Sequence, residues 1–394
     1  MAPRERVPLK SLAWVFLKLG TVAFGGPAAH IAMMEHEAVR RRGWLSRQEF
    51  LDLAGAANLL PGPSSTELAI YIGYSRAGRR GLVLAGTCFI LPAMVMVGTL
   101  AALYVRFGSL PEVTGVLYGV KPVVIAVVLQ ALWGLGRASI KSWVLAAVGI
   151  AAAGATIIGA SQLLVLASAG LAVMTYRNVA RAGGVLAAWH LFVPRSAERA
   201  SRMVASGAVA ARAATAGAFG LWPLFLVFLK VGAVLFGSGY VLLAFLRADF
   251  VQRLGWLTER QLLDAVAVGQ ITPGPVFTTA TFIGYVLGGT PGALVATAGI
   301  FLPSFLLVAV SGPLLPRLRS SAMAGAGAFL DGVIAASLAL MAVVTWHLGR
   351  AALIDPLTVA LAGTSLTLLL RYRVNSSWLV LAGALVGLSQ LRPH

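Results

Sequence analysis

Two copies of a Pro-Gly-Pro motif interrupt otherwise apolar segments of the chain, and small hydroxyl side chains follow each copy. Proline cannot continue a helix from the preceding turn, but it is well placed to begin a new one. Each copy therefore predicts a fresh helix start, whose first N–H groups lack intrahelical partners and favour an anion. The residues are Pro61, Gly62, Pro63, Ser64, Ser65 and Thr66 in the first copy, and Pro273, Gly274, Pro275, Thr278 and Thr279 in the second.

A second pair of helix breaks is rich in glycine, and each of these breaks follows a segment that contains a lysine. Four helix starts and two cations that met inside a membrane would suit a tetrahedral oxyanion. The alternatives are glycines that only let helices pack closely and lysines that extend to the headgroups. Recurrence of both features favours a binding site, which would add Lys18, Gly25 and Gly26 in the first half and Lys230, Gly237, Ser238 and Gly239 in the second.

Three acidic residues are candidates for coupling the site to an ion or a proton. Asp52 and Asp264 occupy equivalent places in the two halves, where they could carry protons, pair with basic residues or stabilise a helix start. Glu67 lies four residues after the end of the first Pro-Gly-Pro motif, and a threonine stands at the equivalent place in the second half. It could titrate during transport or cap its own helix, and the sequence leaves both interpretations open.

The composition predicts an all-α polytopic membrane protein with broken or re-entrant helices. Hydrophobic residues make up 59% of the chain and charged residues 11%, and the mean hydropathy is +0.87. Residues 82–105, 142–176 and 265–316 contain no charge, whereas a spanning helix needs about 20 apolar residues. Irregular backbone is tolerated at membrane depth only where protein or a water-filled cavity surrounds it.

The net charge of +18 does not indicate a nucleic-acid-binding protein. The arginines form short clusters between apolar segments, as expected of cytoplasmic loops, so the lipid bilayer is the predicted environment. The single cysteine, Cys88, excludes an internal disulfide, and the five histidines show no metal-ligand spacing. No nucleotide-binding loop or catalytic triad spacing is evident, so we expect neither a cofactor nor an enzyme.

The chain repeats itself at an offset of about 212 residues. Identities include Lys18/Lys230, Trp44/Trp256, Asp52/Asp264, Gly62/Gly274 and Pro63/Pro275. Such duplication with breaks at matching places is typical of secondary transporters. The predicted organisation is an N-terminal half, 1–177, a basic cytoplasmic linker, 178–217, and a homologous C-terminal half, 218–394.

The charges of equivalent turns differ between the halves and predict that the repeats are inverted. Arg79 and Arg80 lie in the turn that follows the first Pro-Gly-Pro helix, whereas the matching turn, 288–292, has no charge. The number of helices predicted before the linker is even, which would leave the halves parallel. Inversion therefore requires that this helix count is wrong by one, within 8–42 or 142–176.

In these motifs the chain resembles the chromate ion transporter (CHR) family, in its long two-domain form. The resemblance implies chromate efflux across the inner membrane, driven by the proton motive force, with sulfate as a close analogue. It extends over the whole chain and leaves a homodimer open. It rests on Phe24-Gly25-Gly26-Pro27, Gly43-Trp44-Leu45, Asn58 to Pro63 and Gly73-Tyr74, and on Phe236 to Gly239, Gly255-Trp256-Leu257, Gln270 to Pro275 and Gly284-Tyr285.

Two other functions compete with oxyanion transport. A transporter of an unrelated anion or solute could use the same scaffold. An integral-membrane enzyme that acts on lipid or an anionic headgroup would place its catalytic residues at one site, whereas the polar features here are duplicated. The duplication favours transport.

Overall fold

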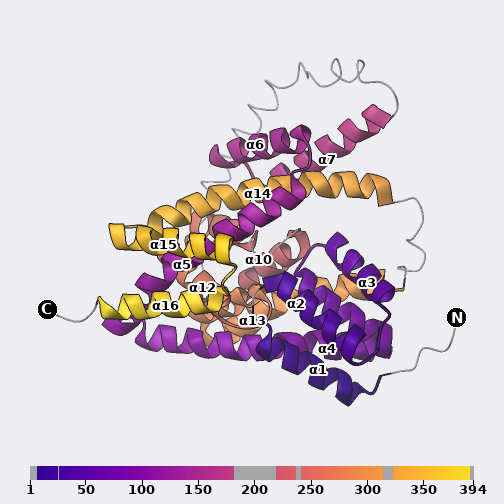
Figure 1. Ribbon diagram of the computed structural model, residues 1–394, viewed down its shortest axis with the longest axis horizontal. Coiled ribbons are helices and arrows are strands. Elements are labelled where there is room, and N and C mark those ends of the chain that lie inside the picture. Colours follow the sequence, from indigo (N-terminus) through magenta and orange to yellow (C-terminus); the bar gives the residue numbers. More distant parts are fainter. Residues whose placement is uncertain (1–6, 25, 182–218, 237–240, 314–322, 391–394) are drawn as a thin grey trace.

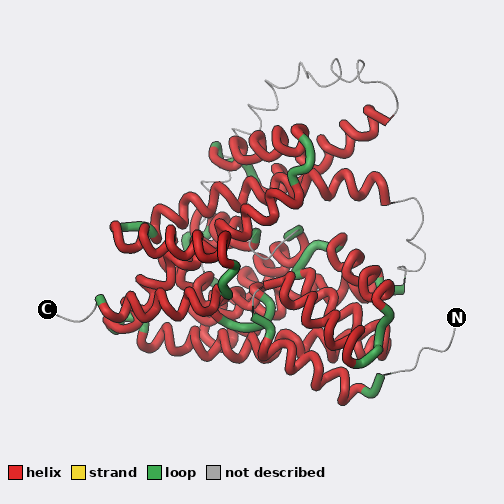
Figure 2. The backbone as a smooth tube through the Cα atoms, viewed as in Figure 1, coloured by secondary structure: helices red, strands yellow, loops and turns green. Residues whose placement is uncertain are grey.

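The computed structural model describes residues 7–24, 26–181, 219–236, 241–313 and 323–390. These described residues form helices joined by short turns, with no strand among them (Figures 1 and 2). The all-α fold expected from the composition is confirmed.

Short, broken helices open the first half, and longer apolar helices follow them. Helix α2 runs directly into the π-helical turn η1, and Ser46 and Glu49 form a capping box at the start of α3. The elements are α1 (Leu9–Val22), α2 (Gly26–Glu35), η1 (His36–Arg41), α3 (Arg47–Leu59), α4 (Ser64–Phe107), α5 (Pro111–Ser139), α6 (Trp143–Ile157) and α7 (Gln162–Arg181).

The second half repeats this order. A capping box formed by Thr258 and Gln261 starts α12, as its counterpart does in α3. The elements are α10 (Leu221–Val234), α11 (Leu242–Leu246), η2 (Arg247–Arg253), α12 (Glu259–Ile271), the 3₁₀ turn η3 (Val276–Thr278), α13 (Thr279–Ser311), α14 (Met323–Ala352), α15 (Pro356–Thr367), η4 (Leu368–Tyr372) and α16 (Ser376–Ser389).

Helices α4 and α13 each fold back on themselves at a glycine. The backbone leaves the helical region at Ala77 and Gly78, where the φ angle of Gly78 is 61°. The two arms then touch so closely that a Cβ atom on Gly73 would lie 2.2 Å from the carbonyl oxygen of Gly81. The turn at Gly288 and Gly289 repeats this geometry in α13. The helix start predicted after the first Pro-Gly-Pro motif is therefore the beginning of the first arm of α4.

Helices of the two halves interleave rather than form separate bundles. Helix α4 packs against α13, α5 packs against α15 and α16, and α14 packs against α6 and α7 (Figure 1). Five helices in the described ranges are long and apolar enough to cross a membrane, within Ser64–Phe107, Pro111–Ser139, Gln162–Ala180, Val276–Ser311 and Gly327–Ala352. The chain is thus a multi-pass membrane protein built from two homologous halves.

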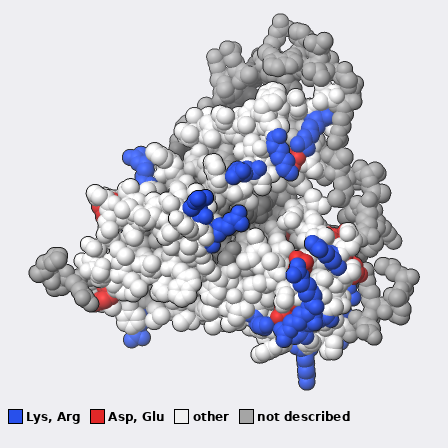
Figure 3. Space-filling model, in the orientation of Figure 1, with Lys and Arg blue, Asp and Glu red and all other residues white. Residues whose placement is uncertain are grey.

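The surface has the character expected of a protein that faces lipid. Uncharged residues cover most of the visible face, and Lys and Arg gather in a few groups (Figure 3). Large apolar side chains such as Trp143 and Ile158 are 73% and 83% exposed. A soluble monomer rarely exposes wide apolar patches, so this surface fits a bilayer.

One buried ion pair links the halves. Lys121 Nζ of α5 lies 2.8 Å from Asp264 Oδ1 of α12, and the Tyr104 hydroxyl of α4 donates to Asp264 Oδ2 at 2.9 Å. The side chains of Lys121 and Asp264 are only 11% and 3% exposed. The equivalent Asp52 is partly exposed on α3 and accepts a hydrogen bond from Gln48. The two repeated aspartates therefore have different surroundings.

We expect Lys121→Ala to destabilise the protein, because Asp264 would remain buried without its cation. Loss of one partner from a buried ion pair costs about 3–5 kcal/mol. Thermal unfolding in detergent should show a large loss of stability for K121A. Part of that stability should return in K121A/D264N, which removes both charges. The exposed pair Arg177–Asp331 supplies the control, since R177A should cost about 0–1 kcal/mol. A K121A protein as stable as wild type would contradict this role.

The predicted inversion of the halves can be tested at the turns of α4 and α13. Arg79 and Thr290 are both exposed, and buried Cys88 can be replaced by serine. Single cysteines at positions 79 and 290 would be treated with an impermeant maleimide outside intact cells. We expect Thr290→Cys alone to be labelled. Position 79 lies in an arginine-rich turn, which is expected on the cytoplasmic side, where the reagent cannot reach it. Labelling of both positions, or of neither, would contradict inversion.

Candidate oxyanion site at the broken helices

Each Pro-Gly-Pro motif is hydrogen-bonded to the first helix of the opposite half. The Gly62 N–H donates to the carbonyl oxygen of Leu235 at 2.7 Å, where α10 ends. The Gly274 N–H donates to the carbonyl oxygen of Ala23 at 2.9 Å, where α1 ends. These two bonds satisfy backbone groups at helix breaks and place both motifs at the contact between the halves.

The first break leaves buried polar atoms without partners. The amides of Thr66 and Glu67 both donate to the carbonyl of Pro63, at 2.8 and 3.0 Å. The side chains of Thr66 and Glu67 are fully buried, yet Thr66 Oγ1 and Glu67 Oε2 have no hydrogen-bond partner within the described part of the chain. Buried polar atoms are rarely left unpaired, so such a pair at a helix start is a candidate place for a ligand or an ordered water.

Glu67 folds back over the Pro-Gly-Pro motif toward α13. The Ser304 hydroxyl donates to Glu67 Oε1 at 3.3 Å. A Cβ atom on Gly62 would lie 2.5 Å from Glu67 Oε1 and 2.7 Å from Ser304 Oγ, and the φ angle of Gly62 is 134°. Glycine is therefore required at position 62 both for the backbone angle and for the space beneath the carboxyl group.

His30 connects the two breaks of the first half, and sequence reasoning missed it. Its Nε2 lies 3.0 Å from the carbonyl oxygen of Ala23, and its Nδ1 lies 3.2 Å from Ser65 Oγ. A carbonyl oxygen can only accept, so Nε2 carries a proton, and a neutral ring then accepts the Ser65 hydroxyl proton at Nδ1. The only signal in the sequence is its place on the short helix after the Gly25-Gly26-Pro27 break.

The second break satisfies its own hydroxyl groups. The hydroxyls of Thr278 and Thr279 donate to the carbonyls of Pro275 and Val276, both at 2.8 Å. A Cβ atom on Gly274 would lie only 2.6 Å from the methyl carbon of Ala93. Gln270 Nε2 is a buried side-chain atom just before this break that lacks a hydrogen-bond partner among the described residues.

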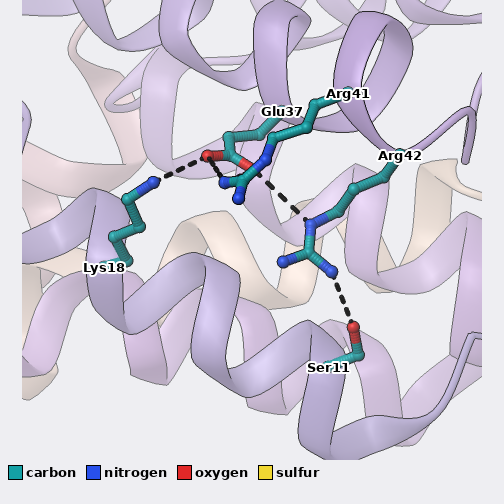
Figure 4. Close-up of polar contacts among 5 residues, drawn as sticks. All are labelled: Ser11, Lys18, Glu37, Arg41 and Arg42. Carbon is teal, nitrogen blue, oxygen red and sulfur yellow. Dashed lines mark hydrogen bonds and ion pairs between the residues drawn. The ribbon is translucent and has the colours of Figure 1, made fainter.

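The two predicted lysines each pair with an acidic residue. Lys18 Nζ lies 2.9 Å from Glu37 Oε1, and Arg41 and Arg42 also donate to this carboxylate (Figure 4). Burial alone would raise the pKa of Glu37, but hydrogen bonds from Lys18 and Arg41 lower it to about 2. Lys18 also lines an open cleft of about 430 Å³. Contact of Lys18 with a substrate stays a prediction.

The second half repeats this cluster at the same offset. Lys230 Nζ donates to Asp249 Oδ1 at 2.7 Å, and Arg253 Nε donates to the same oxygen at 3.0 Å. Asp249 and Arg253 lie 212 residues after Glu37 and Arg41. The acidic partners were missed because an aspartate replaces a glutamate, so a search for identical residues does not find them.

Part of the predicted site lies outside the described residues. Gly25, Gly237, Ser238 and Gly239 are in this group. Gly26 is described and begins α2 with a φ angle of 78°. Of the predicted first-half residues, the structure brings Gly62, Ser65 and Thr66 together with Glu67, whereas Lys18 points to Glu37.

Comparisons with a family model and with individual known proteins point to the same family. The model of the family described as chromate transporter matches residues 10–176 and again residues 222–388. The chromate transport protein of Cupriavidus metallidurans is 35% identical over 392 residues, which cover 96% of this chain and 92% of the relative. That of Pseudomonas aeruginosa is 32% identical over 379 residues, covering 94% and 90%. The probable chromate transport protein of Synechococcus elongatus is 33% identical over 357 residues, covering 88% and 86%.

No solved structure matches the chain. The relatives are transport proteins rather than enzymes, and the double match covers both halves of the repeat. The resemblance noted from the motifs is therefore confirmed, and the chain belongs to the chromate transporter family.

Proposed function

We propose that this protein exports chromate, or a similar tetrahedral oxyanion such as sulfate, across the inner membrane with energy from the proton motive force. The observation that carries the proposal is the start of α4, where a fully buried Thr66 hydroxyl lacks a partner among the described residues. A helix start with hydroxyl donors stabilises negative charge. The names of the relatives point to the same chemical class.

The substrate class is argued from charge and shape. Chromate and sulfate are both tetrahedral dianions, and a helix start with hydroxyl donors recognises both features. Nothing in the described site is specific to chromium or sulfur, so we expect the two ions to compete. A different anion carried on the same scaffold is the alternative, and competition experiments separate it.

The geometry suggests how the site would open alternately. The bonds from Gly62 to Leu235 and from Gly274 to Ala23 both cross the contact between the halves. A rocking motion of one half against the other would exchange these bonds for others while the helix start stays at the same depth. Such motion is the usual form of alternating access in repeat-built transporters.

Transport into inverted membrane vesicles tests the proposal. Vesicles with this protein should take up radiolabelled chromate faster than vesicles without it, and excess sulfate should reduce the rate. Collapse of the proton motive force should slow uptake. Equal chromate uptake in the two kinds of vesicle would contradict chromate export, and sulfate uptake in the same vesicles would show which oxyanion is carried.

We expect Lys18→Gln and Lys230→Gln to weaken apparent oxyanion affinity more than protein abundance. Glu37 keeps Arg41 and Arg42 as partners in the first variant, so the fold should tolerate the change. Loss of one charge-assisted contact costs about 1.5–3 kcal/mol, which is about 10- to 150-fold in affinity. The half-saturation concentration for uptake measures this. Unchanged values in both variants would make the lysines structural.

A further inference from the structure

The two breaks share a backbone plan but differ in chemistry. Glu67 is replaced by Thr279 in the second half, and at an offset of 211 residues Ser304 corresponds to Ala93. The hydroxyl of Thr279 is bonded to the backbone, whereas Glu67 Oε2 and Thr66 Oγ1 are buried and unpartnered within the described chain. A ligand that needs an unpaired hydroxyl donor finds one, Thr66, at the first break.

We propose that the oxyanion binds at the first Pro-Gly-Pro break rather than at the second, and that Glu67 takes up one proton together with it. This inference rests on the proposed oxyanion function and names the site and the linkage. The site consists of the start of α4 with Thr66, and Glu67 and Ser304 form its wall.

The linkage follows from the position of the carboxyl group. Glu67 Oε1 lies over Gly62, at the same helix start that would attract the oxyanion. An ionised carboxylate there would compete with the oxyanion for the positive end of the helix and repel it. A protonated carboxyl group removes that repulsion and adds one O–H donor. Proton and oxyanion therefore favour each other's binding.

Several other titratable groups near α4 are bonded to other partners. The Ser304 hydroxyl is the only side chain that hydrogen-bonds Glu67 in the described ranges, and no cation there pairs with it. Among the elements that pack against α4, Lys18 of α1 is bonded to Glu37, and His30 of α2 is bonded to Ser65 and Ala23. On α3, Glu49 is bonded to Ser46 and Arg76, and Asp52 is bonded to Gln48. Asp264 of α12 is paired with Lys121, Tyr71 of α4 itself is bonded to Ser311, and α13 contributes Tyr285.

The charge balance is compatible with export. A dianion that travels with one proton carries one net negative charge. A membrane potential that is negative inside drives this charge outward, while an inward proton gradient opposes it. The proposal therefore assigns the driving force to the electrical part of the proton motive force.

Calorimetry on the purified wild-type protein tests the linkage without any substitution. Sulfate is the probe, because it remains a dianion near neutral pH. Titration in two buffers of different ionisation enthalpy should show about one proton taken up per sulfate bound. In the pH range of this uptake, the sulfate dissociation constant should rise about tenfold per pH unit. Binding with no proton uptake at any pH between 5 and 9 would overturn the linkage.

Two variants and one control locate the effect. Glu67→Gln imitates the protonated carboxyl group, so it should bind sulfate with an affinity that does not change with pH. Thr66→Val removes the unpartnered hydroxyl and should weaken binding about tenfold or more. Glu112→Gln alters an exposed carboxylate at the start of α5 and should keep the wild-type pH dependence. Wild-type pH dependence in E67Q, or wild-type affinity in T66V, would overturn the assignment.

Failure of the inference and failure of the proposed function give different results. If the wild-type protein transports chromate or sulfate but binds it without proton uptake, the linkage is wrong and the oxyanion function stands. If the wild-type protein neither binds nor transports either ion at any pH, the proposed function is wrong and the inference falls with it.

Discussion

The need to satisfy backbone hydrogen bonds at helix breaks inside a membrane governs this structure. An unpaired N–H or C=O in hydrocarbon is costly, so irregular backbone must be closed by protein. Gly62 and Gly274 meet this need by donating across the molecule to the ends of α10 and α1. The breaks depend on the interleaving of the two halves, because each break is hydrogen-bonded to the opposite half. The same hydrogen bonds help to fix the position of one half relative to the other.

The scaffold is repeated, but its polar content is not repeated throughout. The Lys18–Glu37–Arg41 cluster recurs as Lys230–Asp249–Arg253, which indicates a role that both halves need. Four other polar residues have no polar or charged equivalent of the same kind in the other half. The equivalent positions of His30, Glu67, Lys121 and Ser304 are Leu242, Thr279, Ile334 and Ala93. The duplicated fold has thus kept its helix breaks twice, but it has the unpaired Thr66 hydroxyl and the Glu67 carboxyl group only at the first break.

This asymmetry has a physical consequence for transport. Two identical anion sites close together would repel each other's ligands. One anion site beside a break whose hydroxyl groups are bonded to the backbone avoids that cost. The buried pair of Lys121 and Asp264 lies at a different contact between the halves. Apart from Glu67, the buried charged side chains of the described residues are in ion pairs, and the site at α4 keeps the unpaired groups that a substrate would use.

The sequence alone determined the all-α membrane fold, the two halves, the helix breaks and the family. These properties depend on composition, on proline and glycine placement and on spacing, which a linear chain displays directly. Tertiary structure decided which groups meet. It placed Lys18 against Glu37, His30 against Ser65, and Asp264 against Lys121, because these partners lie 19, 35 and 143 residues apart and only helix packing brings them together. It also showed Gly62 bonded to the opposite half, since no local pattern records a hydrogen bond between backbone groups that are distant in sequence.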